Sequence, residues 1–181
     1  MVSPRPYQLA LVTPPATEPL TLAEAKLFLR VDGSTDDTLI SSLITSARIA
    51  AEQYMKRSLI EQTWKLTYDD YVTTETRLLM MPIQSVTSVT IVARDDTATV
   101  VDESTYYLSA NKEILIFDAT PFGHKVEIVY VAGYGDASDI PGPIKQGMLV
   151  HIAALYHQRS QQMDIPEYGK ALYAPYRIIR F

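Results

Sequence analysis

Residues 36–55 read DDTLISSLITSARIAAEQYM, and this stretch decides the helical part of the fold. Its apolar residues recur at steps of three and four, from Leu39 to Met55, which is the spacing of one face of an α-helix. Asp36 and Asp37 stand where an N-cap and an acidic first turn are favourable. The sequence therefore predicts a long helix here, with Arg48 and Glu52 on its solvated face.

Shorter helices are predicted on both sides of this one. Thr21 and Glu24 form a capping-box pattern, so a helix begins there and ends near residues 32–33. Two prolines at 141 and 143 precede a run with apolar residues on one helical face up to about residue 161. A further short turn is expected over 166–173. Residues 1–19 contain five prolines, which predict an extended arm.

The middle of the chain changes to a period of two. Trp64, Leu66 and Tyr68 alternate with polar residues, which is typical of a half-buried strand. Other runs rich in β-branched and aromatic residues lie at 86–92, 106–108, 114–117 and 126–130. Five to seven strands are expected, forming a small antiparallel sheet or sandwich that packs on the same core as the helices.

These elements predict an α+β fold. It is a bundle of about three to four helices with an inserted antiparallel β-sheet or sandwich subdomain and extended arms at both ends. The expected parts are an N-terminal arm at 1–19, a helical core at 20–61 and 141–164, a β-rich insertion at 62–135 and a C-terminal tail at 165–181. We expect them to form a single intertwined domain.

Composition limits the functional classes. The 181 residues carry a formal charge of −5, with 16 basic and 21 acidic side chains, which argues against a protein that holds nucleic acid through its overall field. There is no cysteine, so disulfides and thiolate metal sites are excluded. The apolar run at 9–12 is too short for a signal peptide or a membrane span. We therefore expect a protein that is made in the cytoplasm and does not associate with a membrane.

Motifs for chemistry are weak throughout the chain. His151 and His157 are six residues apart, whereas a helical zinc pair needs three or four. The fragment Gly133-Tyr134-Gly135 runs into Asp136 and prolines, so it predicts a plain turn and not a dinucleotide site. The paired aspartates at 36–37, 69–70 and 95–96 are interpreted as cap and turn residues. We expect no catalytic residue, no cofactor and no metal, and hence no enzyme.

The C-terminal tail differs from the rest of the chain, because its composition indicates a binding surface. It combines aromatic and cationic side chains, including Tyr168, Tyr173, Tyr176 and Arg177, and aromatics with arginine are the residue types that anchor protein interfaces. Two interpretations stay open: the tail binds a partner, or it packs back on its own domain.

Several segments, in their order and spacing, resemble the tailed-phage head-to-tail connector (adaptor, or head-completion) family, in its longer form with a β-rich insertion. The resemblance covers about residues 19–178. It is carried by LTLAEAK at 20–26, LRVD at 29–32, QTW at 62–64, YVAGYG at 130–135, Pro141 with PIKQ at 143–146, and APYR at 174–177.

The resemblance implies a non-enzymatic structural protein in the neck of a tailed-phage or phage-like virion. Members form a ring, commonly of twelve subunits, that joins the portal protein to a tail-side connector or tail-terminator protein. Double-stranded DNA passes through the lumen without specific binding. The implied portal interface comprises Tyr168, Tyr173, Pro175, Tyr176, Arg177, Ile178, Arg180 and Phe181.

An acidic lumen would let DNA slide, because it offers no basic contacts to phosphates. We expect acidic residues such as Asp36, Asp37 and Glu52, or the carboxylates of the sheet, to line it. Two alternatives to the connector remain: a tail-completion or tail-terminator protein that docks on the tail tube, and a small ligand-binding or hydrolytic domain built on the sheet.

Overall fold

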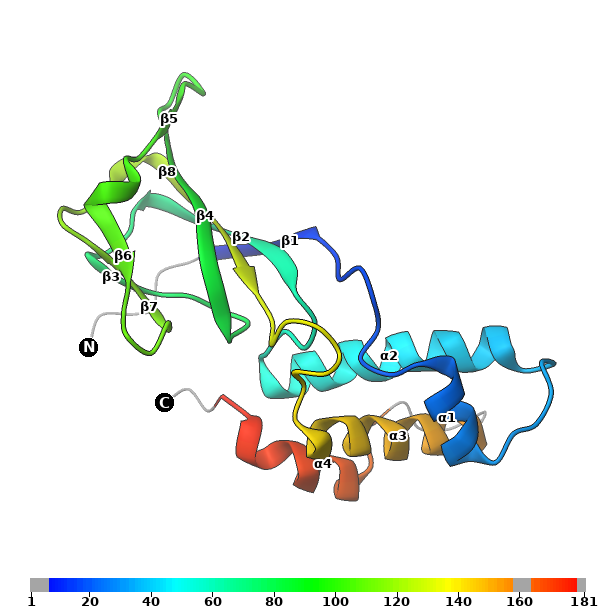
Figure 1. Cartoon of the computed structure of the whole chain (residues 1–181). Helices are drawn as coiled ribbons and strands as arrows, with labels where there is room; N and C mark the ends of the chain where they lie inside the picture. The colour runs from blue at the N-terminus through cyan, green and yellow to red at the C-terminus, as the bar shows by residue number, and fades with distance from the viewer. Residues whose placement is uncertain (1–6, 158–163, 179–181) are drawn as a thin grey trace. The chain divides into compact units, whose positions relative to one another are not determined.

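The computed structural model describes residues 7–157 and 164–178, and the described chain falls into two compact units (Figure 1). One unit comprises residues 16–60 and 134–181 and is helical. The other comprises residues 1–15 and 61–133 and is built from strands. The combination confirms the predicted α+β class.

The helical unit contains α1 (Leu22–Leu29), α2 (Asp37–Met55), α3 (Gly142–His157), α4 (Glu167–Tyr173) and the 3-10 turn η2 (Ala174–Tyr176). Its core is lined by apolar side chains from all four α-helices, because each helix turns one apolar stripe inward. Fully buried members include Ile40, Ala47, Ile144, Met148 and Tyr173. α1, α2 and α4 lie close to the predicted positions and α3 begins at the predicted prolines, whereas the predicted end of α3, near residue 161, lies outside the described residues.

The strand unit contains a five-stranded sheet in the order β1-β2-β8-β4-β5. Its strands are β1 (Tyr7–Thr13), β2 (Gln62–Tyr71), β8 (Phe122–Ala132), β4 (Ile83–Val92) and β5 (Ala98–Val100), and all neighbours are antiparallel. A second sheet has three strands, β3 (Glu75–Arg77), β7 (Ile114–Phe117) and β6 (Tyr106–Leu108), and the short turn η1 (Glu103–Thr105) leads directly into β6.

Three of these strands were not predicted. β1 lies in the proline-rich arm, where the extended conformation was expected but not its pairing with β2. β3 and β5 are three residues long, which is too short for an alternating pattern to stand out. The Asp69-Asp70 pair was expected in a turn. It lies instead inside β2, where Asp70 has φ 66° beside an irregularity in the pairing with β8.

The N-terminus of α1 is a complete capping box. The Glu24 amide donates to the Thr21 hydroxyl at 3.2 Å, and the Thr21 amide donates to the Glu24 carboxylate at 2.7 Å. The Thr21 hydroxyl also donates to the Glu24 carboxylate at 2.7 Å. The two bonds that this carboxylate accepts lower the pKa of Glu24, the bond from the Thr21 amide having the larger effect and the bond from its hydroxyl the next. A lowered folded pKa stabilises the protein above the unfolded pKa, and this contribution disappears as the pH falls through the folded pKa.

Replacing Thr21 by alanine is therefore expected to lower the free energy of unfolding by about 1 kcal/mol at neutral pH. The loss should shrink under acidic conditions, where Glu24 is protonated in both proteins. Urea unfolding of both proteins at neutral and acidic pH measures this. Thr38→Ala, at the exposed start of α2, is the control and should change stability by less than about 0.5 kcal/mol. An equal loss at both pH values would contradict the role of Glu24.

Candidate functional site

The C-terminal segment holds the predicted interface residues, and the structure separates them by burial. Tyr168 on α4 is 63% exposed, and Pro175 and Arg177 are also exposed. Tyr176 and Ile178 are half-buried. Tyr173 has no exposed surface at all. The remaining two predicted residues, Arg180 and Phe181, lie outside the described residues.

Residues 173–178 pack on the end of α2. The Ile178 amide donates to the Met55 carbonyl at 3.0 Å, and the Arg57 guanidinium donates to the Tyr176 carbonyl. The Arg177 guanidinium lies 4.9 Å from the centre of the Tyr54 ring, a cation–π contact. The sequence left two interpretations open for the tail. The described part of the tail packs on its own domain, as the second of them expects, and it still exposes Pro175 and Arg177.

Tyr173 is a core residue of the helical unit. Its ring lies against Gly147 of α3, where an added Cβ would come within 2.5 Å of Cε1. Its ring centre is 6.1 Å from that of Tyr54. Burial raises the pKa of the Tyr173 hydroxyl, because the charged form would lose its hydration. The glycine thus makes room for the tyrosine and fixes how α4 meets α3.

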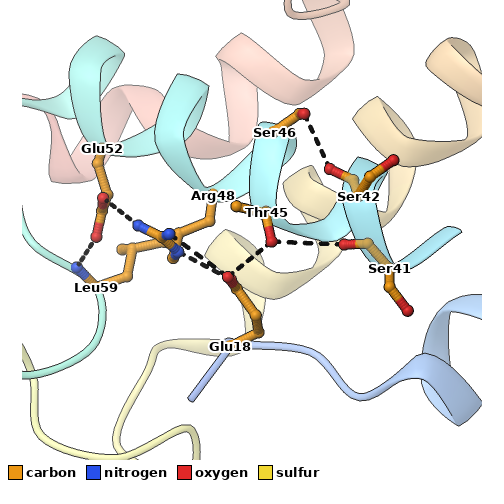
Figure 2. Close-up of polar contacts among 8 residues, drawn as sticks. All are labelled: Glu18, Ser41, Ser42, Thr45, Ser46, Arg48, Glu52 and Leu59. Atoms are coloured by element: carbon orange, nitrogen blue, oxygen red, sulfur yellow. Dashed lines mark hydrogen bonds and ion pairs between the residues drawn. The ribbon is translucent and has the colours of Figure 1, made fainter. Parts of the chain in front are cut away.

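A buried charge cluster ties together three segments of the helical unit (Figure 2). The Arg48 guanidinium donates to Glu18 at 2.8 Å and to Glu52 at 2.9 Å. Glu52 also accepts the Leu59 amide at 2.9 Å, and the Thr45 hydroxyl donates to Glu18 at 2.9 Å. The cluster joins the chain before α1, the middle of α2 and the chain that leaves α2.

This cluster corrects the prediction that Arg48 and Glu52 face solvent. They are 8% and 5% exposed, because Glu18 and the Leu59 amide supply partners that make their burial possible. The spacing of apolar residues along the helix could not show this, because a prediction from that spacing places charged residues at the surface. The expectation that Glu52 lines a lumen is wrong for the same reason.

The other two carboxylates expected in the lumen also take part in internal contacts, though both keep some exposed surface. Asp36 is the N-cap residue of α2, but its side chain makes no capping bond and instead accepts from the Tyr156 hydroxyl of α3. Asp37 pairs with Lys26 of α1 at 2.6 Å. Both carboxylates therefore hold helices together.

The exposed side of α2 carries no charge. Between Asp37 and Lys56, its charged residues are Arg48 and Glu52, which are buried. Hydroxyls on the exposed side bond to the helix backbone. Ser41 donates to the Asp37 carbonyl at 2.8 Å. Ser46 donates to the Ser42 carbonyl at 2.9 Å (Figure 2). This face is therefore neutral, with serine hydroxyls bonded to the helix backbone, and it also exposes Leu39 and Ile49, at 39% and 43%.

The rest of the described structure was searched for metal sites, grooves and membrane-spanning helices. Within residues 7–157 and 164–178 there is no group of three or more His, Asp or Glu side chains able to hold a metal ion. His151 is buried on α3. A groove on the five-stranded sheet is lined by side chains of β1, β2 and β8, where Lys65 and Glu127 pair at 3.2 Å. None of the described helices is long and apolar enough to cross a membrane.

Comparison with known families decides the affiliation of the chain. The sequence model of the head completion protein family matches residues 18–163. The chain belongs to the head completion protein family. The match covers α1 to α3 and β2 to β8, and it confirms the resemblance noted in the sequence. No curated protein matches the chain.

Solved structures share the fold of this head completion protein. A chain from the virion of a native gene transfer agent (GTA) particle has a TM-score of 0.80 at 24% identity, with 96% of each chain covered. Chains from the neck of an empty GTA particle, solved with C6 symmetry, and of a native one, solved with C12 symmetry, have TM-scores of 0.79 and 0.76. Each is 23% identical over 96% of this chain and 97% of the other.

Proposed function

We propose that this head completion protein is a structural, non-enzymatic component of a virion neck. In this proposal it forms a ring that joins the portal to the tail and continues the DNA channel. The observation that carries the proposal is the family match over residues 18–163, together with a fold shared over 96% of the chain with neck components of GTA particles.

In the proposed ring, the helical core at 20–61 and 141–164 forms the wall, with the arm at 1–19 and the insertion at 62–135 as further parts of one domain. The exposed face of α2 supports this, because an uncharged helix face that exposes Leu39 and Ile49 can pack against a neighbouring subunit. A head-to-tail ring needs two different patches on each subunit. The net charge of −5 suits a channel that does not hold DNA.

The portal contact is proposed on the exposed part of the C-terminal segment. Tyr168, Pro175 and Arg177 are accessible there, and Arg180 and Phe181 follow in sequence. Aromatic and arginine side chains supply much of the energy of protein interfaces. Tyr173 would contribute by holding α4 in place from within the core.

The test mixes the protein with its cognate portal and follows assembly by native mass spectrometry and negative-stain microscopy. Full-length protein is compared with a chain that ends at Tyr176, which keeps α4 and its buried Tyr173. Ring formation on the portal that is lost on truncation would support the connector and its portal contact. Binding to the end of a tail tube, with none to the portal, would instead support the tail-completion alternative.

Tyr168→Ala is expected to weaken portal binding by about tenfold, because it removes an exposed aromatic from the proposed interface. Its thermal stability should stay unchanged, since the side chain is 63% exposed. The matched control is Tyr107→Ala, which truncates a tyrosine that is 57% exposed on β6 of the other unit. Affinities measured by surface plasmon resonance decide the matter: equal affinities for both variants would remove Tyr168 from the interface.

A further inference from the structure

One edge of the five-stranded sheet has no strand partner among residues 7–157 and 164–178. β1 pairs with β2 on one side only. Its seven residues, YQLALVT, contain no charge and no proline. Tyr7 and Leu11 are each 45% exposed and Val12 is 53% exposed. The pairing with β2 is regular from Tyr7 to Leu11 and shifts only after Leu11.

Natural sheets protect edges of this kind. An open edge presents a row of backbone donors and acceptors, and proteins blunt it with charged residues, prolines or very short strands. The edge strands β3 and β6 of the three-stranded sheet are each three residues long, but β1 has none of these protections over Tyr7–Leu11. Such an edge is suited to pairing with an added strand from another chain.

The opposite edge of the same sheet offers a matching segment. β5 and its flanks, residues 97–101, read TATVV and are uncharged. All three residues of β5 are exposed, with Val100 at 67%. Charged residues bound this segment on both sides, with Asp95 and Asp96 before it and Asp102 and Glu103 after it. The neutral stretch is therefore similar in length to the regular part of β1.

The directions of the strands decide which edges can meet in a ring. Each neighbour in the order β1-β2-β8-β4-β5 is antiparallel, so the two edge strands, β1 and β5, run in the same direction. In a ring with C12 symmetry, neighbouring subunits differ by one twelfth of a full turn. Such a rotation turns a strand by about 30° at most, which lies within the range of roughly 10–35° found between adjacent strands.

We propose that β1 of one subunit pairs in parallel with β5 of the next, so that the sheets continue from subunit to subunit around the ring. This inference rests on the proposed ring. Pairing of β1 with β1, or of β5 with β5, would need strands related by a two-fold axis, and it would close a dimer and not a ring. A head-to-tail ring needs two different patches on each subunit, and the edges of β1 and β5 provide them.

Charged substitutions test the two edges on the full chain with its cognate portal. Leu11→Lys and Val100→Lys each place a charge on one edge, so both are expected to abolish rings while circular dichroism and unfolding stay as in the parent protein. Tyr107→Lys places the same charge on an exposed site of the other sheet and should leave rings intact. Rings formed by Leu11→Lys or Val100→Lys would overturn the pairing.

Disulfide cross-linking tests which strands pair and in which direction. The chain has no cysteine of its own, so any disulfide must join the introduced cysteines. Paired strands lie ~4.8 Å apart, within the Cα separation of about 4.4–6.8 Å that a disulfide spans. Variants combining a cysteine at Gln8 or Ala10 with one at Ala98, Thr99 or Val100 are oxidised after assembly. At least one pair should give a ladder of covalent multimers, whereas each single variant stays monomeric on a denaturing gel.

The outcomes separate this inference from the proposed function. Rings on the portal without a ladder from any pair would overturn the β1–β5 contact and leave the connector role standing. Covalent dimers from a single cysteine on β1 would also overturn it, because they show the two-fold pairing. If the parent protein forms no ring with its portal, the proposed function and this inference both fail.

Discussion

Replacing Arg48 by methionine is expected to lower the free energy of unfolding by about 3–5 kcal/mol. The guanidinium is the counter-charge of two carboxylates, Glu18 at 2.8 Å and Glu52 at 2.9 Å. Glu52 is 5% exposed and also accepts the Leu59 amide, so Arg48→Met takes the guanidinium away from a carboxylate that stays buried. Removing one partner of a buried charge pair costs far more than a well-made pair gains.

A double variant separates lost charge pairing from lost packing. Arg48→Met with Glu52→Gln removes the buried charge but keeps a side-chain oxygen for the Leu59 amide. It should recover a large part of the loss. Lys170→Met is the surface control, since Lys170 pairs with Glu167 at 2.6 Å where Glu167 is largely exposed, and pairs at the surface contribute little to stability.

Denaturant unfolding followed by two signals measures these effects. Far-UV circular dichroism reports mainly on the helices, whereas the fluorescence of Trp64, the only tryptophan, reports on β2 in the strand unit. The circular dichroism transition should move to lower denaturant in Arg48→Met. A loss below about 1 kcal/mol, or a double variant no more stable than the single one, would contradict the role given to the cluster.

The helices could be predicted because their causes are local. The capping box at Thr21 and the three-four spacing from Leu39 to Met55 each lie within one element, and the structure has α1 and α2 there. The longer strands could be predicted for the same reason, β2 from the alternation of its residues and β4 and β8 from their β-branched and aromatic residues. Fold class and family could therefore be reached from sequence, whereas the pairing of β1 depends on β2, which lies beyond both α1 and α2 in the chain.

The candidate site was less predictable, because burial is set by partners far away in sequence. Arg48 is covered by Glu18, which precedes α1. Tyr173 turns inward because Gly147 leaves space on α3. The cluster of aromatic and basic residues in the tail was visible as a composition. Which of its members face outward could be known only once α3 and α4 were packed.

Replacing Tyr173 by alanine is expected to lower the free energy of unfolding by about 3–5 kcal/mol, the usual cost of emptying an aromatic core site. The ring has no exposed surface and fills the space above Gly147. Its hydroxyl, by contrast, has no hydrogen-bond partner among the described residues. Removing an unsatisfied buried hydroxyl is close to neutral or stabilising.

Tyr173→Phe is therefore the matched control, and its stability should lie within about 1 kcal/mol of the parent protein. Both variants are measured by denaturant unfolding with circular dichroism, and Tyr173→Phe is also assayed for portal binding. If Tyr173 acts from within the core, the phenylalanine variant binds the portal as the parent does. A stable Tyr173→Phe that fails to bind would move this hydroxyl into the interface, because only a direct contact could then explain a loss of affinity without a loss of fold.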